Sequence, residues 1–499
     1  MKHILKTSFF FAITVAGILF TGCKKEVMDV PNENDPDFKK VYSNGEDIQN
    51  VASGLFNTLF NGEHSYSGVE MMLAVAADNV SCSWGNAGMR DMSYEPRDNA
   101  WINTPAYGNN GFTKYTYDKC YSAINTASNV IKAINGGVNI GDNGADNNRS
   151  LAVARFIQGV AYGNLALVFD RAHVVDESKT VEGVLSTALP FNEVADAAVA
   201  YLDEAISLAG SGFTIPADWF GAASDISSAD FIKMANTAAA RILAYTPRNK
   251  TQLAAVNWAK VKTYADNGIT QDWEVVMDAY TNWYFEAGDY LTFPGWGITD
   301  MYTVNMLDHT QPQHWDNSAS FPYPPPSTSP DDERMNTDFE YVSSNWLLAS
   351  RGYYHFSNYR FKRYDDIYLN GVGPKAEVMK AENDMLRAEA RAYTGDLSGA
   401  AAIINAGTRT TRGNMPNVAA NLTEIVNAIH HERFVEMYTT GMGLQFFEMR
   451  KLDLLQKGTP LQLPLPAKTM ELFGEKQPFY SFGTTAKADG IGTSNGGWR

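Results

Sequence analysis

Apolar residues recur along most of this 499-residue chain with the 3.6-residue period of an α-helix. In residues 115–136, for example, Tyr117, Tyr121, Ile124 and Ile131 fall on one helical face. The same pattern occurs in residues 151–170, 194–209, 231–245, 253–265, 376–393 and 422–438. No long series of alternating strands is apparent. The sequence therefore predicts a mainly α-helical fold.

Small residues recur where neighbouring helices would have to approach each other closely. In residues 151–170 they are Ala152, Gly159, Ala161 and Gly163. In a second segment, spacings of 7, 5 and 7 separate Ala388, Gly395, Ala400 and Gly407. These offsets match the close-packing positions of a tetratricopeptide helix pair, although Arg391 stands where an aromatic residue is expected. We predict tetratricopeptide-like helix pairs, with generic antiparallel pairs as the alternative.

Two long stretches, residues 81–116 and 281–360, have a different character. They are irregular, polar and rich in glycine, proline and aromatic residues. Loops of this length in a compact protein are usually either functional or disordered, and their tryptophans argue against disorder. We therefore expect long ordered loops supported by the helices.

The N-terminus contains the pattern of an exported protein. A short basic stretch precedes an apolar run of 13 residues, Ser8–Phe20, whereas roughly 20 are needed to span a bilayer as a helix. Gly22 and Cys23 follow directly, which resembles a bacterial lipobox. We predict a lipoprotein signal peptide over residues 1–22, lipidation of Cys23 and a polar tether over 23–40. A plain signal peptide with an incidental cysteine is the alternative.

The composition limits the partners of the remaining body, residues 41–499. A net charge of −16 argues against nucleic acids, because binding them requires lysine and arginine to neutralise phosphates. Hydrophobic residues make up 44% of the chain, enough for a sizeable core. Cys82 and Cys120 could form a disulfide or remain buried thiols.

Several motifs, in this order, resemble the SusD/RagB family. After the lipobox come "ARFIQGVAYGNLALVFD", "RAEARAYTGDLSGAAAIINAGTRTTRG", "IHHERFVEMYTTGMGLQFFEMRKLD" and "LQLPLPAKTMEL". The residues that fit the family near the C-terminus are Glu432, Arg433, Glu436, Phe446, Phe447 and Arg450. Thr440 and Glu448 depart from its pattern. We interpret these C-terminal positions as structural, joining the last helices to the body.

The resemblance implies a fold, a location and a function. The fold is a single large SusD-like domain with tetratricopeptide-like units that support a loop-rich part. The location is the outer membrane of Bacteroidetes-type bacteria, lipid-anchored and facing the exterior. The function is to bind an oligosaccharide or polysaccharide and deliver it to a partner TonB-dependent, SusC-like barrel during polysaccharide utilisation.

Aromatic side chains with polar neighbours are the residues that would bind such a ligand. A sugar ring stacks its C–H face on a flat aromatic ring, while planar polar side chains bind its hydroxyls. The candidates in the two loop regions are Trp84, Asn86, Arg90, Trp101, Tyr107, Trp283, Trp296 and Trp315. We expect at least two of the six aromatic residues to form a ligand platform. The alternative for each is to fill a small core beneath its own loop.

Motifs for catalysis were not found. HExxH, GxSxG, Walker A and CxxC patterns are missing, and Val435 stands where an HExxH motif beginning at His431 needs its second histidine. Two acidic runs, 331–333 and 365–366, are expected to be solvated turns rather than a glycosidase pair. The "GDNGADNN" segment has its glycine misplaced for an EF-hand loop. We predict no catalytic residues, metal or cofactor.

Two other functions stay open at this point. One is a lipid-anchored glycoside hydrolase or lyase, which would release product where a binding protein would not. The other keeps the SusD-like fold and changes the cargo to peptide or glycopeptide. The aromatic loops do not exclude this second alternative.

Overall fold

The structure, a computed structural model, describes residues 41–94, 97, 103–179, 187–315, 323–348, 356–477, 479 and 492–499. The predicted signal peptide, the tether with Cys23, and Trp101 lie outside these residues. Residues Tyr42–Arg499 cluster into one compact unit.

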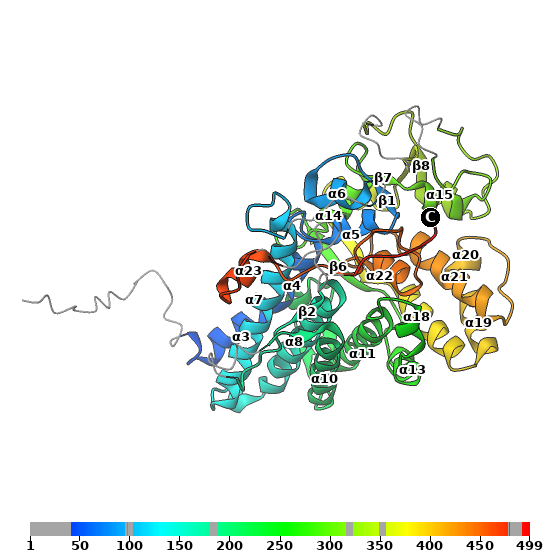
Figure 1. Cartoon of the computed structure of the whole chain (residues 1–499). Helices are drawn as coiled ribbons and strands as arrows, with labels where there is room; N and C mark the ends of the chain where they lie inside the picture. The colour runs from blue at the N-terminus through cyan, green and yellow to red at the C-terminus, as the bar shows by residue number, and fades with distance from the viewer. Residues whose placement is uncertain are drawn as a thin grey trace, which may run out of the picture. The chain divides into compact units, whose positions relative to one another are not determined.

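Eight helices that pack one against the next form a row within this unit. Its members are α7 (Asn110–Asn135), α8 (Asn147–Val168), α10 (Phe191–Ala209), α11 (Ser228–Tyr245), α13 (Trp258–Asp266), α18 (Lys380–Tyr393), α19 (Leu397–Ala406) and α21 (Leu422–Val435). Each packs against the next, and several lie side by side in the lower half of Figure 1. We call this set the helical row. The mainly α-helical prediction is confirmed, and the tetratricopeptide detail stays a prediction.

Glycines in α8 explain how closely its neighbours approach. A Cβ atom on Gly159 would lie 2.6 Å from Cγ of Leu202 on α10, and one on Gly163 would collide with Ile242 on α11. Both glycines therefore have to lack a side chain for the helices to pack at this distance. Within the described chain, α8 is also long and apolar enough to cross a membrane, but 78% of that apolar window is buried inside the body, as in a core helix.

The predicted boundaries of two helices are wrong. Residues 253–265 form two helices, α12 (Lys250–Ala254) and α13, because the Asn257 side chain accepts the Lys260 N–H at 3.0 Å and starts a new helix. The helix predicted over 376–393 begins only at Lys380, since Val372–Val378 form strand β10, which pairs antiparallel with β6 (Trp273–Asp278).

Buried ion pairs and hydrogen bonds join α22 (Leu444–Lys451) to the helical row. We interpret the C-terminal motif as structural, and these contacts agree with that interpretation. Arg433 of α21 donates to Glu389 of α18 at 2.7 Å and to Glu448 of α22 at 2.6 Å. Arg450 donates to the backbone carbonyls of Leu167 and Tyr245. These contacts join segments that are far apart in the sequence.

The two loop-rich regions meet in space through short strands. Strand β1 (Val80–Ser81), at the start of the first region, pairs with β7 (Ile298–Thr299) of the second, whereas β8 (Phe339–Tyr341) and β9 (Tyr359–Phe361) pair with each other at the end of the second region. Short helices interrupt the loops: α6 (Met89–Ser93), α14 (Glu286–Thr292), α15 (Met301–Leu307) and α16 (Arg334–Asp338). The expectation of irregular structure up to residue 116 is wrong at its end, because α7 begins at Asn110. In Figure 1, β1, β7, α6 and α14 lie together above the row.

The remaining elements complete the unit. They are α3 (Gly45–Ser53), α4 (Leu55–His64), α5 (Glu70–Ala76), α17 (Asp365–Tyr368), α20 (Thr408–Thr411), α23 (Ala467–Leu472), and strands β2 (Arg171–Ala172), β3 (Leu189–Pro190), β4 (Thr214–Ile215) and β5 (Ile226–Ser227). In the parts of the chain that the structure describes, every sheet has two strands.

Candidate ligand-binding surface

Four partly exposed aromatic rings gather where the loop-rich regions meet. Tyr66 follows α4, Phe112 lies in the first turn of α7, Tyr290 lies on α14, and Trp296 precedes β7. The ring centroid of Tyr290 is 4.4 Å from that of Trp296, and that of Tyr66 is 5.2 Å from Tyr290 and 6.1 Å from Phe112. The rings are tilted or edge-to-face, arrangements that favour aromatic pairs.

Trp346 extends this cluster and is the most exposed aromatic side chain of the set, at 64%. A Cβ atom on Gly295 would lie 3.5 Å from Cε3 of Trp346, so the indole lies beside the residue that precedes Trp296. We call Tyr66, Phe112, Tyr290, Trp296 and Trp346 the aromatic face.

The backbone of Trp346 has φ of +56°, which is unfavourable for a bulky residue. A turn holds it there: the buried Asn345 side chain donates to the Ser357 carbonyl at 2.8 Å and accepts the Leu347 N–H at 3.0 Å. Trp346 N–H donates to the Ser344 hydroxyl. Strain that fixes a solvent-exposed tryptophan is a signal of function.

Two further aromatic residues, Phe293 and Trp84, are linked to the aromatic face through the backbone of nearby residues. Phe293, three residues before Trp296, is 55% exposed. The backbone N–H of Leu348 donates to the Ser83 hydroxyl at 3.0 Å, which places the segment after Trp346 beside Trp84. Trp84 itself is half-buried against the core. The two loop regions thus contribute jointly to this surface.

Two polar side chains, Tyr107 and Asn109, lie just before the first turn of α7 and bond a carboxylate of α6. Tyr107 donates a hydrogen bond to Asp91, and Asn109 donates to the same carboxylate at 2.6 Å. Burial and the hydrogen bond to Asp91 raise the pKa of Tyr107 well above its usual range, so the phenol stays protonated at neutral pH. Arg90, beside Asp91 on α6, is exposed, and Asn86 is half-buried. This group can hydrogen-bond a polar ligand that rests near Phe112.

Two predicted candidates lie in the core. Trp283 is 8% exposed, and its ring centroid lies 5.7 Å from Phe56 and 5.2 Å from Phe60. Trp315 is 6% exposed and donates its indole N–H to the Phe356 carbonyl at 2.6 Å. Both rings pack in the core, which agrees with the alternative that an aromatic candidate fills a small core beneath its own loop. Trp84, Asn86, Tyr107 and Trp296 are half-buried and Arg90 is exposed, so these residues stay candidates for ligand contact, whereas Trp283 and Trp315 are buried.

Sequence reasoning missed Trp346, Tyr66, Tyr290 and Phe112. For Trp346 a signal was present: "SSNW" places serine and asparagine, residues whose side chains cap turns, just before an aromatic residue. For the other three no local signal existed, because Phe112 and Tyr290 lie on helices and Tyr66 at a helix end.

The acidic runs serve mainly as ion-pair partners. Asp332 is fully buried between Arg334 and His431, so the expectation of a solvated turn is wrong at this residue. Burial opposes its ionisation, but hydrogen bonds from His431 and Arg334 hold the pKa of Asp332 well below its usual range. Asp365 accepts two hydrogen bonds from Arg360. Carboxylates held in this way do not resemble a glycosidase acid–base pair.

Other candidate sites have local explanations. In the "GDNGADNN" segment, Asp146 pairs with Arg149 at 3.2 Å and the Asn147 side chain accepts the Ile140 N–H. Cys82 and Cys120 are buried free thiols. His309 and Asp331 pair on the surface beside Asp308.

A cleft of about 480 Å³ with several charged residues in its lining lies beside β10, α18 and α20. Its lining includes Arg363, Arg412, Glu436 and Asp384. These charges pair with one another or with neighbours: Arg412 bonds Glu436 at 2.7 Å, and Lys380 bonds Asp384. Aromatic surface is confined here to Tyr364. The aromatic face is therefore the stronger candidate for binding a ligand with flat apolar faces.

Comparison with known proteins assigns the fold. No family model and no curated protein sequence matches the chain. Solved structures do. A SusD superfamily protein from Parabacteroides distasonis has a TM-score of 0.62 at 12% identity, over 87% of this chain and 99% of that one. A SusD-like carbohydrate binding protein from Bacteroides vulgatus has a TM-score of 0.55 at 17% identity, with 84% and 86% covered.

A third similar structure is surface glycan-binding protein A from Bacteroides uniformis, with a TM-score of 0.56 at 14% identity over 83% of this chain and 91% of that one. The chain therefore has the SusD-like fold, and the resemblance seen in the sequence motifs is confirmed at the level of the fold.

Proposed function

We propose that this chain is a non-catalytic, lipid-anchored glycan-binding protein of the SusD/RagB type. It captures oligosaccharide or polysaccharide at the outer surface of the outer membrane and delivers it to a partner TonB-dependent, SusC-like barrel. The single observation that favours this most is the aromatic face, above all the exposed indole of Trp346 in its strained turn.

Three further observations support the proposal. Two of the similar structures are a carbohydrate binding protein and a surface glycan-binding protein. Tyr107 and Asn109, which both donate to Asp91, lie within five residues of Phe112 in the sequence, where the group can bind sugar hydroxyls. The apolar N-terminal run ends at Gly22-Cys23, in the position of a lipidation signal.

The net charge of −16 bears on the charge of the glycan that would bind. A negatively charged protein repels polyanions at long range, so neutral glycans are favoured over sulfated or uronic ones. Because the rings of the aromatic face are spread over several elements, the ligand should span more than one sugar unit.

The test is a calorimetric titration of the purified full chain with soluble neutral and acidic polysaccharides, with each mixture assayed for new reducing ends. We expect saturable binding to a neutral glycan, no product, and loss of binding in the Trp296→Ala/Trp346→Ala double variant. Leu472→Ala, which changes an 83% exposed side chain on α23, is the control.

Other outcomes would replace the proposal. Release of product would favour the glycoside hydrolase or lyase. Binding of peptides rather than glycans would favour peptide or glycopeptide cargo. For the anchor, Cys23→Ser should move the chain from the membrane fraction to the soluble fraction.

A further inference from the structure

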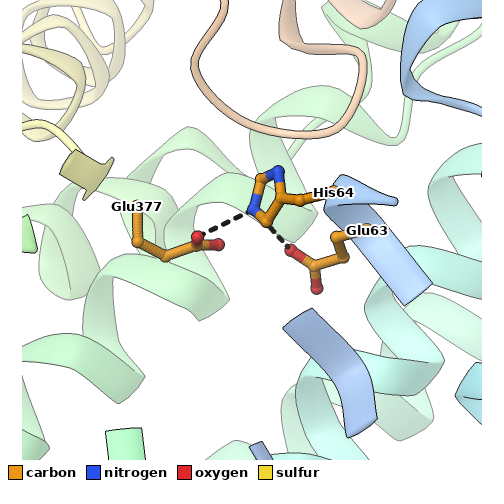
Figure 2. Close-up of side chains that lie close together, drawn as sticks. All are labelled: Glu63, His64 and Glu377. Atoms are coloured by element: carbon orange, nitrogen blue, oxygen red, sulfur yellow. Dashed lines mark hydrogen bonds and ion pairs between the residues drawn. The ribbon is translucent and has the colours of Figure 1, made fainter. Parts of the chain in front are cut away.

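A buried histidine lies among three carboxylates at the end of α4. His64 Nε2 is 2.8 Å from Glu377 Oε2 and 3.9 Å from Glu63 Oε2, while His64 Nδ1 is 2.9 Å from Glu70 Oε2. Exposed fractions are 1% for His64 and at most 6% for the three acids. Figure 2 shows the carboxylates of Glu63 and Glu377 both directed toward the His64 ring.

This cluster differs from the other buried charge groups. In those groups a guanidinium lies between the acids, as Arg433 lies between Glu389 and Glu448. Here the ion-pair partner is one imidazole: Glu377 and Glu63 both approach His64 Nε2, and Glu70 approaches Nδ1. Buried carboxylates that gather around one ring are stabilised by a proton or a cation.

We propose that Glu63, His64 and Glu377 bind one divalent transition-metal ion, for which zinc is the test ion. The ligand atoms are His64 Nε2 and one carboxylate oxygen from each acid. These atoms all lie within 4.8 Å of one another. Around a tetrahedral zinc with ligand distances of about 2.0–2.2 Å, neighbouring ligand atoms are roughly 3.3 Å apart.

The separations of 2.8 and 3.9 Å from His64 Nε2 lie on either side of that value, so each carboxylate oxygen is within about 0.6 Å of the tetrahedral distance to this nitrogen.

The surroundings have the features of a metal site. Metal-bound histidine usually donates its other ring N–H to a carboxylate, and His64 Nδ1 is placed to donate to Glu70. The second oxygen of Glu63 accepts a hydrogen bond from Asn164 at 2.5 Å. The rings of Phe60 and Phe285, with centroids 4.8 and 4.6 Å from that of His64, shield it from water. These contacts fix the orientation of two of the three ligands.

The donor atoms select the ion. One imidazole nitrogen with two carboxylate oxygens suits zinc and its neighbours in the first transition row, whereas calcium prefers six to eight oxygen ligands. A bound ion would link α4 to β10, whose ligands are more than 300 residues apart in sequence. Because Tyr66 follows His64 by two residues, the link would also hold the base of the aromatic face.

The experiment measures zinc in the purified full chain after incubation with zinc and dialysis against metal-free buffer. We expect about one zinc per chain, no retained calcium, and a higher unfolding temperature than in the chelator-treated protein. Glu377→Gln and Glu63→Gln should each weaken zinc binding by more than about 100-fold, because even the loss of a supporting residue costs about 10–100-fold. Glu70→Gln should weaken it by about tenfold.

The surface group of Asp308, His309 and Asp331 supplies the matched control, since its side chains also lie within reach of a common ion. His309→Ala should keep the zinc. Loss of zinc in His309→Ala, or no zinc in folded wild-type protein, would overturn the proposal.

X-ray absorption on the zinc-loaded wild-type protein needs no variant to fold. It should show one nitrogen and two or three oxygen ligands at about 2.0–2.2 Å. A sulfur ligand or six oxygens would also overturn the proposal.

Discussion

The helical row and the aromatic face are built in opposite ways. In the row, small residues and buried ion pairs let helices pack at close distance, so nearly every side chain on its inner surface is covered. On the aromatic face, rings from several elements remain partly exposed, and one is held in a strained backbone conformation. The packing of the row favours stability, whereas the aromatic face is less stable because its rings and a strained backbone stay exposed to solvent.

This contrast predicts where a mutation will act. Changes in the row should alter the free energy of unfolding, while changes on the aromatic face should alter binding and leave unfolding nearly unchanged.

The largest expected effect is on a buried ion pair of the row. Arg433→Met would remove the guanidinium that lies between Glu389 and Glu448 and leave Lys451, with His430 beside Glu448, as their ion-pair partners, so we expect a loss of about 3–5 kcal/mol in the free energy of unfolding. Urea denaturation measures it. Arg387→Met, which removes a partly exposed pair with Asp266, should cost less than about 1 kcal/mol. Equal losses of unfolding free energy in the two variants would mean that the buried ion pairs do not stabilise the row more than surface pairs do.

Close packing in the row gives the next effect. Gly159→Leu would force a side chain into Leu202 and the Ala198 carbonyl, and we expect a loss of about 2–3 kcal/mol. Gly111→Leu is the control, because a Cβ atom at Gly111 meets nothing within 4 Å. Thermal unfolding of both variants tests this, and an unaffected Gly159 variant would mean that the helices are not held at this distance.

Acid should weaken the ion pairs beside α21. The pKa of Asp332 in the folded chain lies below its ordinary value of 3.8, so its ion pair stabilises the fold above that pH. The contribution begins to fall as the pH drops below about 4 and is lost completely only when the pH passes through the lower pKa of the folded state, so the expected loss by pH 3 is about 1 kcal/mol. Urea denaturation across pH 3–7 would show the fall. In Asp332→Asn the acid dependence should be shallower; an unchanged slope would assign it to other groups.

The smallest effect on stability is expected at Trp346. Trp346→Gly removes the indole and relieves the strain at φ of +56°, so the free energy of unfolding should stay within about 0.5 kcal/mol or rise. Glycan affinity should fall at least tenfold, by about 1.4 kcal/mol, as for a central aromatic contact. Calorimetry and denaturation on the same preparation test both. A variant that binds normally but unfolds easily would assign Trp346 a structural role.

Local patterns in the sequence were sufficient to predict much of the helical row. The apolar period located most of its helices, and the small residues at Gly159 and Gly163 indicated close packing before any partner helix was known. Helix ends were less accessible. Residues 372–378 form a strand because β6, about 100 positions earlier in the chain, offers them an antiparallel partner.

Which aromatic residues are exposed was decided only by the tertiary structure. Trp283 and Trp346 both lie in loop-rich sequence, yet Phe56 and Phe60, more than 200 residues away, cover Trp283. Trp346 stays exposed because Asn345 anchors its turn to Ser357 and leaves the ring outside. The buried cluster at His64 has the same origin, since Glu377 reaches it from β10. The helical period of apolar residues is a local property that can be read from the sequence. The solvent exposure of a side chain depends on which distant segment covers it.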